Sequence, residues 1–272
     1  MFKSSMGYPF YSMQLFADPI SLGVLASLLA GVATGLGAIP VLLGGDFSRR
    51  TLDLMLGFAA GVMLAASGFS LLVPALDLIV DWTGVITVVA FGFGLGGVFI
   101  HLADRYIPHD HFEKGHEGPP SVMARVWLLV LAITIHNFPE GLAVGVSFGA
   151  EDITTGAAVA VAIALQNIPE GLAVAAPMVR EGYSRRYAAG LALATGLVEP
   201  VGGLLGVSIV FIAQVLLPYG LAFAAGAMIF VVGEEMVPES HAGGNERLAT
   251  WGLMVGFIVM MTLDNVFGFI FG

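Results

Sequence analysis

The stretch Ile133–Val146 reads I-T-I-H-N-F-P-E-G-L-A-V-G-V and carries polar side chains inside a long apolar segment. These side chains are His136, Asn137 and Glu140, with Pro139 between them. A charged side chain at the centre of a bilayer costs from about 2.5 to more than about 10 kcal/mol, so such residues are rarely accidental. We therefore expect a membrane-spanning helix here that carries the functional centre of the chain.

The same pattern returns further along the chain as Q-N-I-P-E-G-L-A-V, which contributes Gln166, Asn167 and Glu170. Positions i and i+4 share one face of a helix, so His136 and Glu140 point the same way, as do Gln166 and Glu170. The proline before each glutamate removes a backbone hydrogen bond and is expected to kink its helix. Two copies of one costly pattern indicate one shared site.

The composition is that of an integral membrane protein. Hydrophobic residues make up 57% of the 272 residues and charged residues 11%, against about 25% charged in an ordinary soluble domain. Cysteine is absent, which excludes disulfides and thiolate metal sites and leaves carboxylate, imidazole, amide and thioether ligands. The net charge of −10 favours cations as partners and predicts no nucleic-acid partner.

Apolar runs of about 20 residues predict the membrane spans. The predicted spans are eight, at roughly 19–43, 51–74, 83–105, 124–149, 153–178, 186–213, 215–237 and 249–271. Residues 1–17 lack the pattern of a cleavable signal peptide. We therefore predict an all-α polytopic membrane protein, with a short external tail at 1–18 and a single eight-helix transmembrane domain at 19–272.

Basic residues fall on alternate connections between these spans. They are Arg49, Arg50, Arg105, Lys114, Arg125, Arg180, Arg185, Arg186 and Arg247. The positive-inside rule places these connections in the cytoplasm and both termini outside. The opposite connections hold Asp77, Asp81, Glu151 and Asp152. An acidic outer mouth of this kind would concentrate cations before they enter.

A histidine-rich loop at about 106–122 joins the third and fourth predicted spans on the cytoplasmic side. Its centre, His109–Pro120, reads H-D-H-F-E-K-G-H-E-G-P-P. Dense histidine and carboxylate segments capture metal weakly, but an ordinary solvated charged loop has the same composition. Both interpretations remain open from the sequence.

Further acidic residues lie within or near the spans. Glu199, in G-L-V-E-P, falls in the middle of the sixth predicted span and is too deep to reach the interface, which favours function. Glu234, Glu235, Glu239 and His241 lie near the cytoplasmic end of the seventh span, where function and simple interface placement are equally open. Asp264 is an isolated carboxylate in the eighth span, and Met63 reads as core packing on composition alone.

The intramembrane glutamates have no lysine or arginine near them in the sequence. Neighbouring carboxylates in a low-dielectric environment must be protonated or meet a cation. Two divalent ions bridged by glutamates would balance their charge. Mixed imidazole, amide and carboxylate ligands suit zinc and its first-row neighbours better than calcium, and binding to such ligands depends on pH.

The paired motifs H-N-F-P-E-G and Q-N-I-P-E-G, the eight spans and the histidine-bearing loop resemble the ZIP (Zrt/Irt-like) metal transporters, particularly the bacterial ones. The resemblance covers essentially the whole chain. It implies a first metal held by His136, Glu140, Gln166, Glu170 and Glu199, with Met63 nearby. It implies a second metal held by Asn137, Glu140, Asn167, Glu170 and Glu199.

The resemblance also implies entrance and exit positions. Ser70 and Asp77 look like the entrance, and the inner exit route would include Asp104, His109, His111, Glu235 and Asp264. Bacterial members of the family can carry Asp where this chain has Asn167, which predicts weaker binding of the second metal. Import towards the cytoplasm by an elevator-like or rocking movement, and a homodimer, are implied as well.

The predicted function is zinc transport across a bacterial inner membrane by alternating access, with cadmium, iron and manganese as further candidate substrates and no organic cofactor. A metal-selective channel or metal-sensing receptor with the same ligands remains open. A proton-coupled transporter of organic solutes is disfavoured, because no intramembrane Arg or Lys would hold a carboxylate substrate.

An intramembrane protease is a remote alternative. Residues 145–149 read G-V-S-F-G, which matches a serine-nucleophile string. His136 precedes it on the same predicted helix and cannot easily reach Ser147, and the chain contains no H-E-x-x-H. We therefore predict that the protein is not an enzyme.

Overall fold

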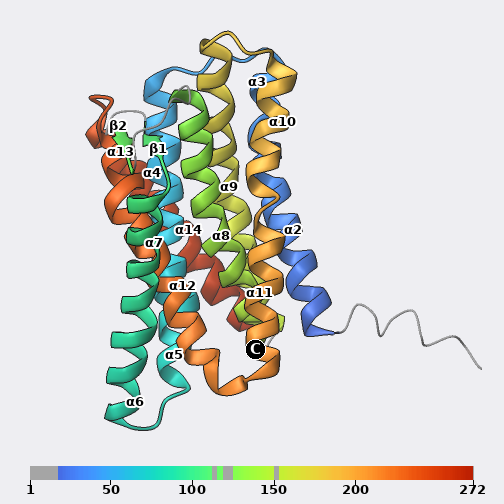
Figure 1. The fold of residues 1–272 in the computed structure, drawn as a ribbon, viewed down its shortest axis with the longest axis vertical. Helices are drawn as coiled ribbons and strands as arrows, with labels where there is room; N and C mark the ends of the chain where they lie inside the picture. The colour runs from blue at the N-terminus through green and yellow to red at the C-terminus, as the bar shows by residue number, and fades with distance from the viewer. Residues whose placement is uncertain (1–17, 112–114, 119–124, 150–152, 272) are drawn as a thin grey trace, which may run out of the picture.

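The computed structural model describes residues 18–111, 115–118, 125–149 and 153–271. These residues form a bundle of long helical segments that run roughly parallel to one axis (Figure 1). In chain order the α-helices are α2 (Pro19–Gly37), α3 (Ile39–Leu42), α4 (Arg49–Ala65), α5 (Val73–Asp77), α6 (Trp82–Thr87), α7 (Gly94–Tyr106), α8 (Arg125–Gly149), α9 (Ile153–Arg180), α10 (Arg185–Gly196), α11 (Glu199–Ile212), α12 (Leu217–Val231), α13 (Val237–His241) and α14 (Glu246–Phe271).

Seven helical segments of the described chain are long and apolar enough to cross a membrane. The remaining long helix, α8, has 25 residues, carries the polar motif and lies among the other helices of the bundle (Figure 1). The prediction of a helical polytopic membrane protein is confirmed. The number of spans, the location of the termini and the extent of the external tail stay predictions.

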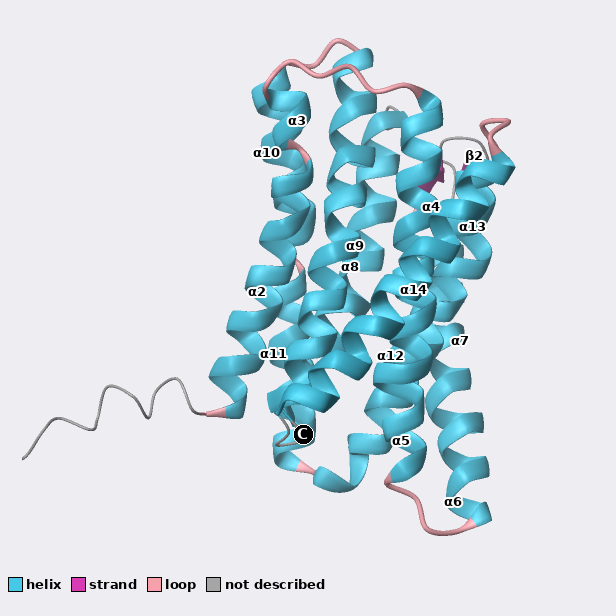
Figure 2. Ribbon diagram, turned by 180° about the vertical axis from the view of Figure 1, so that it is seen from behind, coloured by secondary structure: helices cyan, strands magenta, loops and turns pink. Residues whose placement is uncertain are grey.

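A small antiparallel sheet lies in the predicted histidine-rich loop and is a departure from an all-helical fold. Strand β1 (His109–His111) pairs with β2 (Gly115–Glu117), with His109 opposite Glu117. The sheet lies at the same end of the bundle as α13, whereas α5 and α6 lie at the other end (Figure 2). Residues 109–111 and 115–117 are therefore strand, where the sequence predicted a loop.

The sixth predicted span is not one continuous helix. It divides into α10 and α11, and Glu199 is the first residue of α11. Pro200 explains the break, because it has no N–H to bond the carbonyl four residues earlier and its ring clashes there. The carboxyl group of Glu199 consequently lies at a helix N-terminus, a position that favours an acidic side chain.

Three π-helical segments interrupt the spans. They are η1 (Ala66–Leu72), η2 (Val88–Phe93) and η4 (Val232–Met236), while η3 (Gln214–Leu216) is a 3-10 turn. π-Helical turns occur frequently at functional sites. Ser70 lies in η1 and Glu235 in η4, so two residues that the sequence analysis singled out lie on these segments.

Glycines bring α2, α8, α9 and α11 into backbone contact. A Cβ atom added at Gly171 of α9 would lie 1.7 Å from the Thr34 carbonyl oxygen on α2, and one at Gly141 of α8 would lie 2.0 Å from the Glu199 carbonyl oxygen. Membrane helices without water to drive association pack closely through such small residues. We call α2, α8, α9, α10 and α11 the first group.

A second group packs in the same way. A Cβ atom at Gly61 of α4 would lie 1.9 Å from the Leu253 carbonyl oxygen on α14, and one at Gly96 of α7 would lie 2.0 Å from the Phe223 carbonyl oxygen on α12. We call α4, α7, α12 and α14 the second group. The residue pairs show that α4 and α14 run parallel, since Gly57 meets Ala249 and Gly61 meets Leu253.

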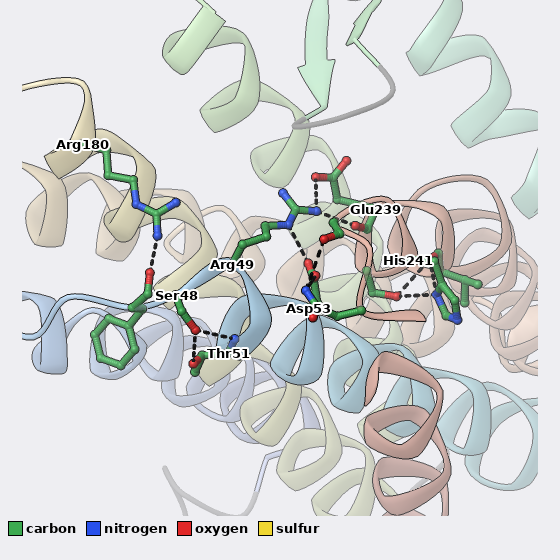
Figure 3. A network of polar contacts seen from close by, with 12 residues as sticks. Ser48, Arg49, Thr51, Asp53, Arg180, Glu239 and His241 are labelled. Atoms are coloured by element: carbon green, nitrogen blue, oxygen red, sulfur yellow. Dashed lines mark hydrogen bonds and ion pairs between the residues drawn. The ribbon is translucent and has the colours of Figure 1, made fainter. Parts of the chain in front are cut away.

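Hydrogen bonds and ion pairs connect the start of α4 to α13 and to the segment before α14 (Figure 3). Arg49 Nε donates to Asp53 Oδ1 at 2.6 Å, and Arg49 Nη2 donates to the Glu239 carbonyl oxygen at 2.7 Å. Asn245 Nδ2 donates to the other Asp53 oxygen at 2.9 Å. Asp53 is fully buried, so this pairing compensates a carboxylate that would otherwise be costly to bury.

Candidate metal site

Polar side chains from α8, α9 and α11 meet in the interior of the first group. We call them the central cluster: Glu140, Gln166, Asn167, Glu170 and Glu199. Each is at most 5% exposed. The helices continue through the prolines of both motifs, since Pro139 lies inside α8 and Pro169 inside α9. These two helices and the start of α11 therefore position the cluster.

The two amide side chains of α9 link it to carboxylates on neighbouring helices. Gln166 Nε2 donates to Glu140 Oε1 at 2.6 Å. Asn167 Nδ2 donates to Glu199 Oε1 at 2.6 Å and to the Ala30 carbonyl oxygen at 2.8 Å. Each amide N–H thus occupies one oxygen of a glutamate and leaves the other oxygen available.

Several buried polar atoms of this region have no hydrogen-bond partner among the described residues. They are Glu140 Oε2, Gln166 Oε1, Asn167 Oδ1, Glu170 Oε2, Glu199 Oε2 and both amide atoms of Asn137. Leaving one such group unpaired costs about 1–3 kcal/mol, and more for a charged group. All but one of these atoms are oxygens, which is the donor set that a divalent cation would satisfy.

The carboxyl groups of the central cluster repel one another when they are ionised. Glu140, Glu170 and Glu199 lie close enough for their carboxylates to interact electrostatically. The sequence has no Lys or Arg between Arg125 and Arg180, nor between Arg186 and Arg247. Buried carboxylates without a compensating charge are unfavourable, so the cluster is suited to hold a positive ion.

Another set of three potential metal ligands lies beside the central cluster. Asp104 of α7, His136 of α8 and Glu235 of η4 are buried, and one ligand atom from each lies within 4.8 Å of the others. His136 Nε2 and Glu235 Oε1 are 2.8 Å apart. Zinc bonds to imidazole nitrogen and carboxylate oxygen are about 2.0–2.2 Å long, so these atoms could converge on one ion after small movements. We call this set the His136 cluster.

His136 joins the two clusters. Its i+4 neighbour on α8 is Glu140, and its ring interacts electrostatically with Glu170 as well as with Glu235 and Asp104. Asp104 lies near the end of α7 that leads to β1. The ligands therefore form a continuous polar series from the interior towards the end of the bundle that holds the sheet.

The resemblance assigns Ser70 to the entrance and Asp264 to the exit route, but the structure brings these two side chains together. Ser70 Oγ donates to Asp264 Oδ1 at 2.7 Å. Because α4 and α14 run parallel, residues late in both helical segments lie at the same end of the bundle. Asp77 follows on α5 and is exposed. Asp264 therefore belongs with Ser70 and not with Glu235.

The remaining candidate residues are placed as follows. Met63 is buried in the main apolar core, and Ser67 Oγ donates to its carbonyl oxygen. The side chains of His109 and His111 in β1 lie outside the described part of the structure. Ser147 is buried and donates to the Ala143 carbonyl oxygen of its own helix at 2.8 Å. A role as metal ligand stays a prediction for Met63, His109 and His111.

Helix α2 contributes to the site, which the sequence analysis missed. Ala30 accepts a hydrogen bond from Asn167, and a Cβ atom at Gly31 would lie 3.4 Å from Glu199 Oε1. Thr34 Oγ1 is buried without a partner among the described residues. The available signal was the small-residue spacing of Gly31 and Gly35, which indicates a close helix contact but not its partner.

Comparison with known proteins shows the same family along the chain. A family model described as "ZIP Zinc transporter" matches residues 106–264. Zinc transporter GufA of Myxococcus xanthus is 49% identical over 251 residues, which cover 90% of this chain and 99% of the relative. Zinc transporter ZIPB of Bordetella bronchiseptica is 46% identical over 254 residues, covering 92% and 82%.

A human relative, zinc transporter ZIP11, is 38% identical over an alignment of 317 positions, gaps included, that covers 85% of this chain and 93% of the relative. The bacterial relatives and the seven apolar helices support an integral position in the inner membrane. Members of the matched family are transporters and not enzymes, which agrees with the engaged hydroxyl of Ser147. The chain belongs to the ZIP family of zinc transporters.

Proposed function

We propose that the protein carries zinc across the inner membrane towards the cytoplasm by alternating access, through a two-metal site in the central cluster. The supporting observation is the set of buried, unpartnered oxygens around three glutamates that have no lysine or arginine near them in the sequence. The first metal would be held by His136, Glu140, Gln166, Glu170 and Glu199, with Met63 nearby. The second would be held by Asn137, Glu140, Asn167, Glu170 and Glu199.

The route would begin at Ser70, Asp77 and Asp264 and leave past the His136 cluster. Ser70 lies on the segment that leads into α5 and Glu235 on the segment that leads into α13, and these two helices lie at opposite ends of the bundle (Figure 2). The end with the His136 cluster also carries Arg49 and Arg105, so the positive-inside rule makes it the cytoplasmic end. His136 would pass the ion from the central cluster to Asp104 and Glu235, because it interacts with both sets.

Movement of the first group against the second would provide the alternating access. Among the described residues, several glycines lie so close to the backbone of another helix that an added Cβ atom would come within 3 Å of it. In each case the two helices belong to the same group. Between groups, Gly220 of α12 faces the side chain of Val146 on α8, with its nearest atom at 3.1 Å. Backbone contacts resist sliding more than side-chain contacts do, since side chains can change rotamer.

Zinc uptake into vesicles that contain the purified protein tests this function. A carrier should show uptake that saturates with zinc concentration and falls steeply on cooling, because each ion requires a conformational change. A metal-selective channel would instead give a current that grows linearly with voltage without saturating. That result would overturn the carrier mechanism and leave the metal site intact.

Replacing Asn167 with Asp should increase tight binding at the second metal position. The Asn167 amide nitrogen donates to Glu199, so the side chain offers the metal only its neutral oxygen, whereas a carboxylate would offer two oxygens and a negative charge. Atomic absorption of washed protein should give one tightly held zinc in the wild type and a second in Asn167→Asp. The exposed Asn265→Asp serves as control. Two tight zinc ions in the wild type would contradict the prediction.

A further inference from the structure

An apolar groove of about 530 Å³ lies between α4, α14 and α9. Its walls include Leu54, Phe58, Leu165, Pro169, Trp251 and Val255. All its lining residues are apolar or glycine. The groove therefore suits a hydrocarbon chain rather than a polar solute.

The groove opens towards the lipid. The three helical segments that form it are candidate membrane spans. Trp251 is 63% exposed, Val255 49% and Ile168 37%, so the apolar wall is accessible from outside the bundle. In a bilayer, the molecules that surround such a wall are phospholipids, whose acyl chains match its chemistry.

Two arginines stand above the groove at one end. Arg50 precedes Leu54 on the same face of α4, and Arg247 precedes Trp251 on the same face of α14, each by about one turn or 6 Å. Both arginines lie at the same end because α4 and α14 run parallel. Both are exposed, and no described residue forms a hydrogen bond or ion pair with either.

We infer that this groove binds an anionic phospholipid of the adjacent leaflet, with its phosphate at Arg50 and Arg247 and one acyl chain along the groove. Guanidinium groups bind phosphate oxygens through charge-assisted hydrogen bonds. The acyl chain would cover the apolar side chains of Leu54 and Trp251 that line the groove. A free phosphate would leave the apolar walls unfilled, and an uncharged lipid would leave the arginines without an anion.

A lipid in this groove would contact both groups of helices and so would affect their relative movement during transport. This effect rests on the proposed function. Helices α4 and α14 belong to the second group, whereas α9 belongs to the first. On α9 the lining residues Ile168 and Pro169 stand between Asn167 and Glu170 of the central cluster. A bound chain therefore lies across the boundary along which the groups would move.

Fluorescence of Trp251 tests the lipid site directly. A Trp82→Phe/Trp127→Phe background leaves Trp251 as the only tryptophan. The protein is placed in vesicles of phosphatidylcholine with increasing amounts of phosphatidylglycerol whose acyl chains carry bromine, a quencher. Each arginine is expected to contribute about fivefold preference for the anionic lipid, so both together give roughly 25-fold. Quenching should saturate at low fractions of brominated phosphatidylglycerol.

Matched variants separate the site from general surface attraction. Arg50→Gln/Arg247→Gln should reduce the preference to about one, whereas Arg50→Lys/Arg247→Lys should retain a clear preference because the charge remains. Arg105→Gln, which removes an exposed charge from α7 away from the groove, should keep the wild-type value. Equal quenching by the brominated forms of both lipids in the wild type, or an unchanged preference in the double Gln variant, would overturn the inference.

Zinc uptake by the same vesicles distinguishes this inference from the proposed function. If the protein prefers the anionic lipid but takes up no zinc, the proposed function fails and the lipid site stands. If the protein takes up zinc but shows no preference for the anionic lipid, the lipid site is overturned and the proposed function stands.

Discussion

Glu140→Ala should abolish zinc uptake, with a loss of more than about 100-fold in the uptake rate at limiting zinc. Glu140 is 1% exposed, accepts a hydrogen bond from Gln166 and has a second oxygen without a partner among the described residues. In the proposed site it bridges both metals, so its removal weakens both. The alanine also leaves the Gln166 amide without its acceptor, which adds a local penalty.

The measurement is uptake of radioactive zinc into vesicles at equal protein content. Glu140→Gln keeps the size of the side chain and removes only its charge, and it should fail almost as completely. Glu181→Ala, an exposed change after the end of α9, should transport at the wild-type rate. Undiminished uptake by either Glu140 variant would refute the role assigned to this residue.

Gly171→Val should prevent stable folding of the first group. A Cβ atom at Gly171 would lie 1.7 Å from the Thr34 carbonyl oxygen, and backbone cannot move aside as a flexible side chain can. Overpacking a well-packed core costs about 1–3 kcal/mol, and we expect more than about 3 kcal/mol here because two helices must separate. Their separation would also break the hydrogen bond from Asn167 to Ala30.

Thermal unfolding in detergent, followed by the fraction of monodisperse protein, measures this effect. Gly190→Val is the matched control, because Gly190 is also helical and a Cβ atom there meets nothing within 4 Å. The control should unfold near the wild-type temperature, with only the small cost of a β-branched residue in a helix. A Gly171→Val protein as stable as the control would contradict the close packing of α2 and α9.

The sequence predicts best those features that depend on local spacing. Apolar runs of membrane length locate most helices to within a few residues, because the bilayer sets their length. The i and i+4 spacing of His136 and Glu140 places both on one face of α8, and the same holds for Gln166 and Glu170 on α9. The break before Glu199 was also readable in principle, since Pro200 follows it directly.

Features that depend on tertiary packing could not be predicted in the same way. The side chains of Asp104, His136 and Glu235 lie close together although they come from three helical segments that are distant in sequence. The hydrogen bond between Ser70 and Asp264 depends on α4 and α14 packing side by side, which no local pattern encodes, although the predicted alternation of the spans already gives them the same direction. The contribution of α2 through Ala30 depends on glycine contacts whose partners appear only in the folded bundle.

The central claim is that the buried glutamates of α8, α9 and α11 are tolerated because zinc ions bind among them. Anomalous X-ray scattering at the zinc absorption edge, measured on crystals soaked in zinc, tests it most directly. We predict a peak between Glu140, Glu170 and Glu199, which disappears in Glu140→Ala crystals. Wild-type crystals that show no zinc at this position, while zinc is bound elsewhere on the protein, would contradict the claim.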